Sequence, residues 1–285
     1  MSDWTIGIIG GAGLYAIDAL EDPQWIAVQS PWGDPSDEIL CGTIGHVRVR
    51  FLPRHGRGHR IAPSTLDSRA NIDALKRAGC TDILAVSAVG SLSEELAPGR
   101  FVTVDQFIDN TKGRPSSFFG DGFVAHVSMA DPVCDRLSGH AAKAVAAAGG
   151  ECTEGATYLA MEGPQFSTQA ESELFRTWGC KLVGMTNGSE AKLAREAGME
   201  FCTIAMVTDF DCWHPDHQDV DVAQVVAVAK SNATSVSGLL EKSLPQLAQL
   251  GESRWAHVLD DAVMTAKEHR CPEMMQRTAA LFRSS

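Results

Sequence analysis

Two aspartates separated by one residue follow a continuous apolar run. Asp209 and Asp211 come directly after residues 200–208, a segment typical of a buried strand. In open α/β sheets, ligands bind beyond the carboxyl ends of the strands, so we expect both carboxylates at such an end. Beside Phe210 and Trp213, they could hold the edge of one planar amino-heterocycle. The alternative interpretation is a pair of solvent-facing acids, because carboxylates mostly lie on protein surfaces.

Three further stretches could bind an anion, and each follows a predicted strand. The first is the turn Gly10-Gly11-Ala12-Gly13, whose backbone N–H groups can converge on a phosphate. The second is Arg54-His55, which supplies a guanidinium suited to an oxyanion, and the third is Ser87-Ala88-Val89-Gly90-Ser91. Each alone fits a structural turn or a surface loop. Their recurrence at three strand ends of one sheet favours a shared site.

Metal and nucleophile chemistry have less support. His55 with His59, and His214 with His217, have spacings that could pair on a metal, but each pair lies in a loop without a third ligand. The chain has no Gly-x-Ser-x-Gly elbow and no cysteine motif that marks a nucleophile. We therefore predict no metal, and chemistry by positioning and electrostatics.

The bulk composition is that of an ordinary globular protein. The 285 residues are 44% hydrophobic and 21% charged, enough for one large domain or a domain with an appendage. The net charge of −12 argues against a nucleic-acid duplex or an anionic membrane as partner. No leader or membrane-spanning stretch is evident, and the eight cysteines form no Cys-x-x-Cys, so we expect a cytoplasmic protein with reduced thiols.

Short β-branched runs alternate with Ala- and Leu-rich segments, which predicts an α/β fold with a mixed twisted sheet flanked by helices. Predicted strands cover residues 5–9, 46–52, 83–89, 101–104, 181–185 and 200–208. Predicted helices cover residues 65–78, capped by Ser64, and residues 141–148, 190–197 and 220–240. The stretch from 244 to 285 is helical in composition, and we expect it to pack on the body or on a neighbouring subunit.

A collinear series of motifs resembles the 5′-methylthioadenosine phosphorylases of the trimeric purine nucleoside phosphorylase family. The matching stretches span about residues 5 to 245 and are Ile8-Ile9-Gly10-Gly11-Ala12-Gly13-Leu14, Arg54-His55-Gly56, Ala70-Asn71-Ile72, Gly90-Ser91-Leu92, Asp105-Gln106-Phe107-Ile108-Asp109, Arg114-Pro115, Met161-Glu162-Gly163-Pro164-Gln165-Phe166-Ser167, Phe175-Arg176-Thr177-Trp178-Gly179, Gly184-Met185-Thr186 and Thr208-Asp209-Phe210-Asp211-Cys212-Trp213. The resemblance implies a single phosphorylase domain over 1–250, with 251–285 as a helical extension. It also implies a homotrimer or a dimer of trimers.

The resemblance implies phosphorolysis of 5′-methylthioadenosine in purine and methionine salvage, with inorganic phosphate as co-substrate and no cofactor. By family position, phosphate would be held by Gly11, Ala12, Arg54, His55, Ser87, Ala88 and Thr186. Backbone amides, a guanidinium and hydroxyls can together neutralise and aim a dianion.

The nucleoside site follows from the same resemblance. Asp209 would protonate or share a proton with purine N7, and Asp211 would support it and accept from the 6-amino group. The other implied contacts are Met185 with the ribose, Phe166 with the base, Glu162 near the sugar, Val222, Val225 and Val226 around the methylthio group, and His126 from the adjacent subunit. The valines alone would fit the buried face of a helix.

Three departures from the family pattern leave alternatives open. Ala12 replaces a Ser or Thr whose hydroxyl contacts phosphate, Gly188-Ser189 replaces a bulky residue and Pro, and Asp67-Ser68 replaces Asn-Tyr. We expect the second change to loosen the turn beside the ribose. The alternatives are a phosphorylase shifted to another 6-aminopurine nucleoside, a phosphate-independent nucleosidase, and a non-catalytic nucleoside-binding subunit.

Overall fold

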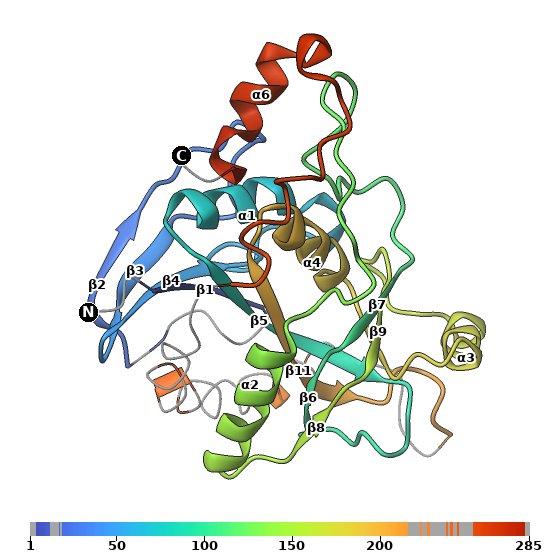
Figure 1. Ribbon diagram of the computed structural model, residues 1–285. Helices are drawn as coiled ribbons and strands as arrows, with labels where there is room; N and C mark the ends of the chain where they lie inside the picture. The colour runs from blue at the N-terminus through green and yellow to red at the C-terminus, as the bar shows by residue number, and fades with distance from the viewer. Residues whose placement is uncertain are drawn as a thin grey trace.

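One mixed β-sheet with helices on both faces forms the body of the molecule (Figure 1). In this computed structural model the described residues are 4–11, 17, 19–215 and 253–282, with isolated positions at 223, 227, 228, 238, 240, 241 and 244. The strands are β1 (Thr5–Gly10), β2 (Glu21–Ile26), β3 (Ile39–Ile44), β4 (Val47–Pro53), β5 (Asp82–Ser91), β6 (Phe101–Thr103), β7 (Gln106–Asp109), β8 (Cys152–Glu154), β9 (Thr157–Ala160), β10 (Leu182–Gly184) and β11 (Glu200–Asp209). The helices are α1 (Ser68–Arg77), α2 (Asp135–Ala147), α3 (Gln169–Thr177), α4 (Asn187–Glu196) and α6 (Pro272–Thr278).

Strand β5 is the hub of the sheet. The order β2-β3-β4-β1-β5-β10-β9-β7 runs through it, and β11 also pairs with β5 before continuing to β6 and β8. β1 and β11 are parallel to β5, whereas β10 is antiparallel. The predicted α/β fold with a mixed, helix-flanked sheet is confirmed.

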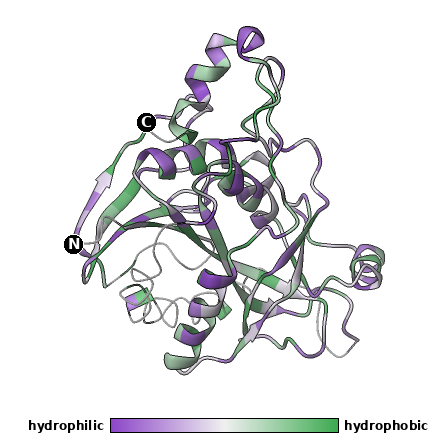
Figure 2. Ribbon diagram, in the orientation of Figure 1, coloured by the Kyte–Doolittle hydropathy of each residue, from purple (hydrophilic) through white to green (hydrophobic). Residues whose placement is uncertain are grey.

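Alternating residues of the central strands serve two cores. Ile8, Val86 and Ile204 face the core that includes α2, while Ile9 and Ala85 face the core that includes α1 and α4. Burial on both faces explains why these strands read as continuous apolar runs. Figure 2 shows the contrast at the sheet edge, where β3 is mainly hydrophobic and the exposed β2 is largely hydrophilic.

All six predicted strands are present, but five others escaped sequence analysis. β2 is exposed along its whole length and carries no apolar alternation. β7, β8 and β9 have only three or four residues each, too few to show a period. β3 has buried residues at both ends but Cys-Gly-Thr in its middle, which interrupts the pattern.

Helix starts were the weakest part of the prediction. α1 begins at Ser68 instead of residue 65, because Asp67 rather than Ser64 caps it and Pro63 opens a separate 3₁₀ turn, Pro63–Thr65. α2 and α4 also begin earlier than predicted, at Asp135 and Asn187. α3 was missed, although Thr168 and Glu171 form a capping box that is visible in the sequence. The predicted helix over 220–240 lies outside the described residues, apart from isolated positions.

The described part of the C-terminal stretch, residues 253–282, is less helical than its composition suggests. It holds α6 and two short 3₁₀ turns, Lys267–His269 and Ala279–Leu281, and the rest consists of turns and loops. Leu259, Ala262 and Leu281 pack into the core beneath α1 and α4. The backbone N–H of His126 donates to the carbonyl of Ala262 at 2.9 Å. A domain boundary at residue 250 stays a prediction.

Among the described residues, no helix combines the length and the apolar character that crossing a bilayer requires.

Candidate active site

The parallel strands β1, β4, β5 and β11 end at the same edge of the sheet. Gly10 pairs with Pro53 at the ends of β1 and β4, and the Arg54 N–H donates to the Gly10 carbonyl at 2.8 Å. The Gly11 N–H donates to the carbonyl of Val86 on β5 at 3.1 Å. The chain therefore brings Gly11, Arg54 and the second half of β5 together, as the sequence predicted for three strand ends.

The antiparallel strand β10 completes this group. Its register pairs Leu182 with Ser91 and Val183 with Gly90. Met185 and Thr186 directly follow the end of β10. Thr186 is buried and precedes α4, and its side chain makes no capping bond. The Ser87 hydroxyl is also buried and has no hydrogen-bond partner among the described residues, so both hydroxyls are available to an anion.

Arg54 forms an ion pair with Glu190 that was not predicted from the sequence. The guanidinium donates from Nε to Glu190 Oε1 at 2.6 Å and from Nη2 to Glu190 Oε2 at 3.0 Å, and each side chain is 1% exposed. Nη1 donates to the Val86 carbonyl at 2.8 Å, and Asn187 Nδ2 donates to Glu190 Oε2 at 2.7 Å. Arg54 is thus fixed by three of its five N–H groups, which leaves two for a ligand. The 136 residues between the partners leave no local sequence signal.

His55 lies beside Arg54 as a buried imidazole. Burial, followed by the nearby Arg54 charge, lowers the pKa of His55 to about 4, so the ring is neutral at neutral pH. Its Nδ1 lies 2.9 Å from the carbonyl of Ile61, and a carbonyl only accepts, so Nδ1 carries the proton. Nε2 is then an acceptor. A contact between Nε2 and phosphate would be made to a protonated phosphate oxygen.

A β-bulge delivers the two aspartates. Along β11, Val207 pairs with Val89 and Asp209 pairs with Gly90, so Thr208 is the extra residue of the bulge. Such bulges re-aim side chains next to active sites. A Cβ at position 90 would lie 2.9 Å from Asp209 Oδ1, so any residue other than glycine would displace this carboxylate.

The carboxylates sit in an environment that favours their neutral forms. Burial raises the pKa of Asp209 and of Asp211. Asp209 Oδ1 accepts the Asp211 N–H at 2.8 Å, and Asp211 adopts a left-handed backbone with φ of 52°. Asp211 Oδ2 is buried, and the nearby Ser172 and Ser167 hydroxyls favour the charged carboxylate without offsetting the effect of burial on its pKa. A buried carboxylate oxygen at this position could accept a hydrogen bond from an exocyclic amino group.

The hydroxyl of Thr208 is positioned to influence whether Asp209 is protonated. It lies 3.2 Å from the Val89 carbonyl and 2.7 Å from Asp209 Oδ2, yet it has one proton to donate. When that proton goes to the carbonyl, which only accepts, the second bond requires a proton on Oδ2. The geometry therefore accommodates a protonated Asp209, the form that an acid catalyst needs.

The loops that follow β9 and β10 carry the residues expected at the sugar and base. Met185 packs against Gly163, where a Cβ would lie 2.5 Å from the methionine sulfur. Both carboxylate oxygens of Glu162 accept bonds within the chain, from Lys112 N at 2.7 Å and from Arg114 Nε at 3.2 Å. Phe166 is 41% exposed. Their contacts with a nucleoside stay predictions.

The substitution of Gly188-Ser189 does not loosen the structure, contrary to expectation. Both residues belong to the first turn of α4 and are buried there. Gly188 lies close to β9, since a Cβ at this position would be 3.1 Å from the Cβ of Ala160. The missing side chain is therefore compensated by close packing of the helix on the strand.

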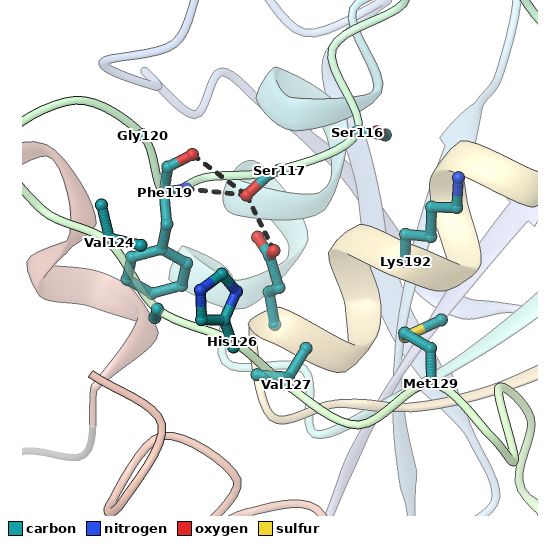
Figure 3. A pocket seen from close by; sticks show the side chains of 11 residues that line it. Ser116, Ser117, Phe119, Gly120, Val124, His126, Val127, Met129 and Lys192 are labelled. Atoms are coloured by element: carbon teal, nitrogen blue, oxygen red, sulfur yellow. Dashed lines mark hydrogen bonds between the residues drawn. The ribbon is translucent and has the colours of Figure 1, made fainter. Parts of the chain in front are cut away.

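His126 lies apart from these groups. Its exposed ring borders a separate cavity of about 320 Å³ that contains none of the other predicted site residues (Figure 3). One wall is the loop around Ser117, whose hydroxyl donates to the buried Glu196 at 2.8 Å. The chain does not bring His126 to its own aspartates, and the prediction that it acts on an adjacent subunit stays open.

Ala12, Val222, Val225 and Val226 lie outside the described residues. Within the described ranges, no three His, Cys, Asp or Glu side chains gather in a group that could hold a metal ion.

Comparison with known proteins gives a consistent result. Residues 5–245 match the model of the phosphorylase superfamily. The S-methyl-5′-thioadenosine phosphorylase of Cereibacter sphaeroides is 54% identical over 97% of this chain and 96% of its own length. The S-methyl-5′-thioadenosine phosphorylase of Rhodospirillum rubrum is 54% identical over 97% of this chain and 95% of its own length.

Solved structures agree. A methylthioadenosine phosphorylase from an antarctic soil metagenomic library superposes with a TM-score of 0.93 at 44% identity, covering 99% of this chain and 100% of that one. A methylthioadenosine phosphorylase from Schistosoma mansoni in complex with adenine superposes with a TM-score of 0.83 at 35% identity, covering 90% of this chain and 96% of that one.

Proposed function

Because this chain belongs to the phosphorylase superfamily, we propose that it is a pentosyltransferase that splits 5′-methylthioadenosine with inorganic phosphate. The products are adenine and 5-methylthioribose 1-phosphate. The observation that carries the proposal is the layout along β5. The residues proposed to hold phosphate lie around residues 86–88, and the aspartates flank Gly90, a separation of about 7–13 Å at the usual rise per residue. One ribosyl carbon with phosphate on one side and a purine on the other fits that interval.

The proposed reaction uses positioning and proton transfer. A phosphate oxygen forms a bond to C1′ as the bond from C1′ to N9 breaks and its electron pair passes to the purine. Arg54 and the hydroxyls of Ser87 and Thr186 would hold the phosphate, because the Gly11 N–H, which the sequence also suggested, already donates to the Val86 carbonyl. Asp209 would give its proton to N7, so that adenine leaves as a neutral base.

Substrate choice follows from the acceptor at Asp211. In its ionised form, Asp211 would accept from the 6-amino group of adenine through the buried Oδ2. A 6-oxopurine would place an oxygen against that oxygen and leave both unsatisfied, which is costly in a buried site. Val222, Val225 and Val226 would supply an apolar wall for the methylthio group, as expected from the sequence.

A phosphate-independent nucleosidase is the second candidate. Two observations favour it, because position 12 has no hydroxyl and the charge of Arg54 is balanced by Glu190. The two guanidinium N–H groups left for a ligand and the free Ser87 hydroxyl support phosphate as the co-substrate instead.

Assembly and location are part of the proposal. We place the enzyme in the cytoplasm as a homotrimer. All eight cysteines are free thiols, which fits a reducing compartment.

The test is to follow adenine release from 5′-methylthioadenosine with and without phosphate, and to identify the sugar product by ³¹P NMR. We expect release only with phosphate, together with a sugar 1-phosphate. Adenosine and inosine serve as comparison substrates, and both should react more slowly. Release without phosphate would identify a nucleosidase, and no release in either condition would refute both candidates.

A further inference from the structure

We propose that Arg114 is a positioning residue that sets the sugar-binding end of the active site, an inference that rests on the proposed function. Arg114 lies in the loop after β7, and its side chain is only 6% exposed. The mechanism described above assigns no task to this buried guanidinium.

Every end of the guanidinium is bonded to a segment that borders the sugar. Nε donates to Glu162 Oε1 at 3.2 Å, Nη2 donates to the Glu162 carbonyl, and Nη1 donates to the Met185 carbonyl. The Lys112 N–H donates to the other oxygen of Glu162 at 2.7 Å, which ties the Arg114 loop to the same carboxylate. One side chain thus joins the loops that follow β7, β9 and β10.

These three loops leave the sheet side by side. Asp109 pairs with Ala160 at the ends of β7 and β9, and Gly184 pairs with Ala160 at the ends of β10 and β9. Beyond these ends, the Met161 N–H still donates to the Gly184 carbonyl at 2.8 Å. Beyond that bond, the hydrogen bonds of Arg114 to Glu162 and Met185 connect the loops.

Met185 is the residue whose position depends most on this arrangement. Its carbonyl is held by Arg114, and its sulfur is pressed against Gly163 in the loop that Arg114 also holds. Met185 directly precedes Thr186, one of the residues proposed to hold phosphate. Thr186, however, has further anchors, since it is the residue before the buried first turn of α4 and its N–H donates to the Tyr158 hydroxyl at 3.4 Å. Loss of Arg114 should therefore move the sugar contact more than the phosphate contact.

The task requires arginine. A planar guanidinium can bond two carbonyls and a carboxylate in three directions, whereas the ammonium of lysine is a single point on a flexible chain. Arg114→Lys keeps the charge and loses this geometry.

The experiment measures kcat and both KM values for the full-length enzyme and for Arg114→Lys, and the affinity of each for free adenine. We expect the KM for 5′-methylthioadenosine to rise about tenfold, the equivalent of about 1.4 kcal/mol. The KM for phosphate and the affinity for adenine should stay within about twofold, because a purely structural defect would change all three together. Arg100→Lys is the control, since Arg100 pairs with the exposed Glu151 at 2.5 Å, and it should change neither KM.

Glu162→Gln is the second variant in case Arg114→Lys does not fold. It keeps the shape of the side chain but removes the charge from the bond to Arg114, so the same KM should rise by a smaller factor. Equal rises in the KM values of both substrates, or an unchanged nucleoside KM, would overturn the positioning role alone. An inactive wild-type enzyme would overturn the proposed function and this inference with it.

Discussion

At the scale of single residues, burial gives Asp209 its chemistry. A carboxyl group that loses water holds its proton to higher pH, and the pKa of Asp209 is raised for that reason. Two hydrogen bonds orient the Asp209 carboxyl group: one between Oδ1 and the Asp211 N–H, and one between Oδ2 and the Thr208 hydroxyl. An acid that is protonated and oriented in this way can deliver a proton to a leaving purine.

Replacing Asp209, the proposed proton donor, should abolish most of the activity. We expect Asp209→Asn to lower kcat/KM for 5′-methylthioadenosine at least about 10²-fold, the scale of general acid catalysis. Asp260→Asn is a matched control, since Asp260 is an exposed partner of His257 and should leave kcat/KM unchanged. Near-normal turnover by Asp209→Asn would exclude the proposed role.

The pH profile gives the same prediction a second readout. Asp209 is protonated below its raised pKa, so wild-type kcat/KM should fall as pH rises through that value. Because the pKa is higher in the folded than in the unfolded chain, the contribution of Asp209 to stability should likewise be present at low pH and be lost as pH rises. The residual activity of Asp209→Asn should lack this limb of the profile, and a limb that persists would have to belong to another group.

At the scale of elements, local capping sets where the helices begin. Asp67 Oδ1 accepts the Ala70 N–H at 3.1 Å and so starts α1, which packs against α4 below the site. Ser64 lies in the preceding 3₁₀ turn and makes no capping bond. The departure at Asp67-Ser68 from the family pattern thus has a structural explanation on the Asp67 side.

Asp67→Ala should therefore lower the free energy of unfolding by about 1 kcal/mol, the usual cost of losing an N-cap. Ser64→Ala should change it by less than about 0.5 kcal/mol, as expected for a surface position without such a feature. Urea denaturation of the two variants measures both values. An equal loss in the two variants would contradict the assignment of the cap.

At the scale of the whole molecule, the site described here leaves one predicted contributor unused. His126 is exposed beside a separate cavity, while its backbone N–H is bonded to Ala262 and the nearby Val124 is bonded to Met264 and Thr265 of the C-terminal segment. A side chain that is held on the surface and kept away from its own active site is free to serve a neighbouring copy.

We therefore expect three 30.5 kDa chains per particle by sedimentation equilibrium. His126→Ala should remain trimeric and raise the KM for 5′-methylthioadenosine about fivefold, the effect of one lost contact worth about 1 kcal/mol. The KM for phosphate should not change. A monomeric wild-type protein that is fully active would refute this assembly.

The sequence by itself determined the class of fold, and it predicted a list of site residues. Strands buried on both faces, such as β5 and β11, can be predicted from their unbroken apolar runs. The polar residues at the ends of these strands are adjacent to the runs in the sequence, so they can be predicted with them. Short or exposed strands such as β8 and β2 carry no such signal and were found only in the structure.

Only the tertiary structure decided how those residues are used. The pairing of Arg54 with Glu190, the bulge at Thr208 and the bonds of Arg114 join positions that are far apart in the chain or depend on strand register. The physical reason is that a side chain's charge, aim and pKa depend on which partners surround it after folding, and those partners come from other elements.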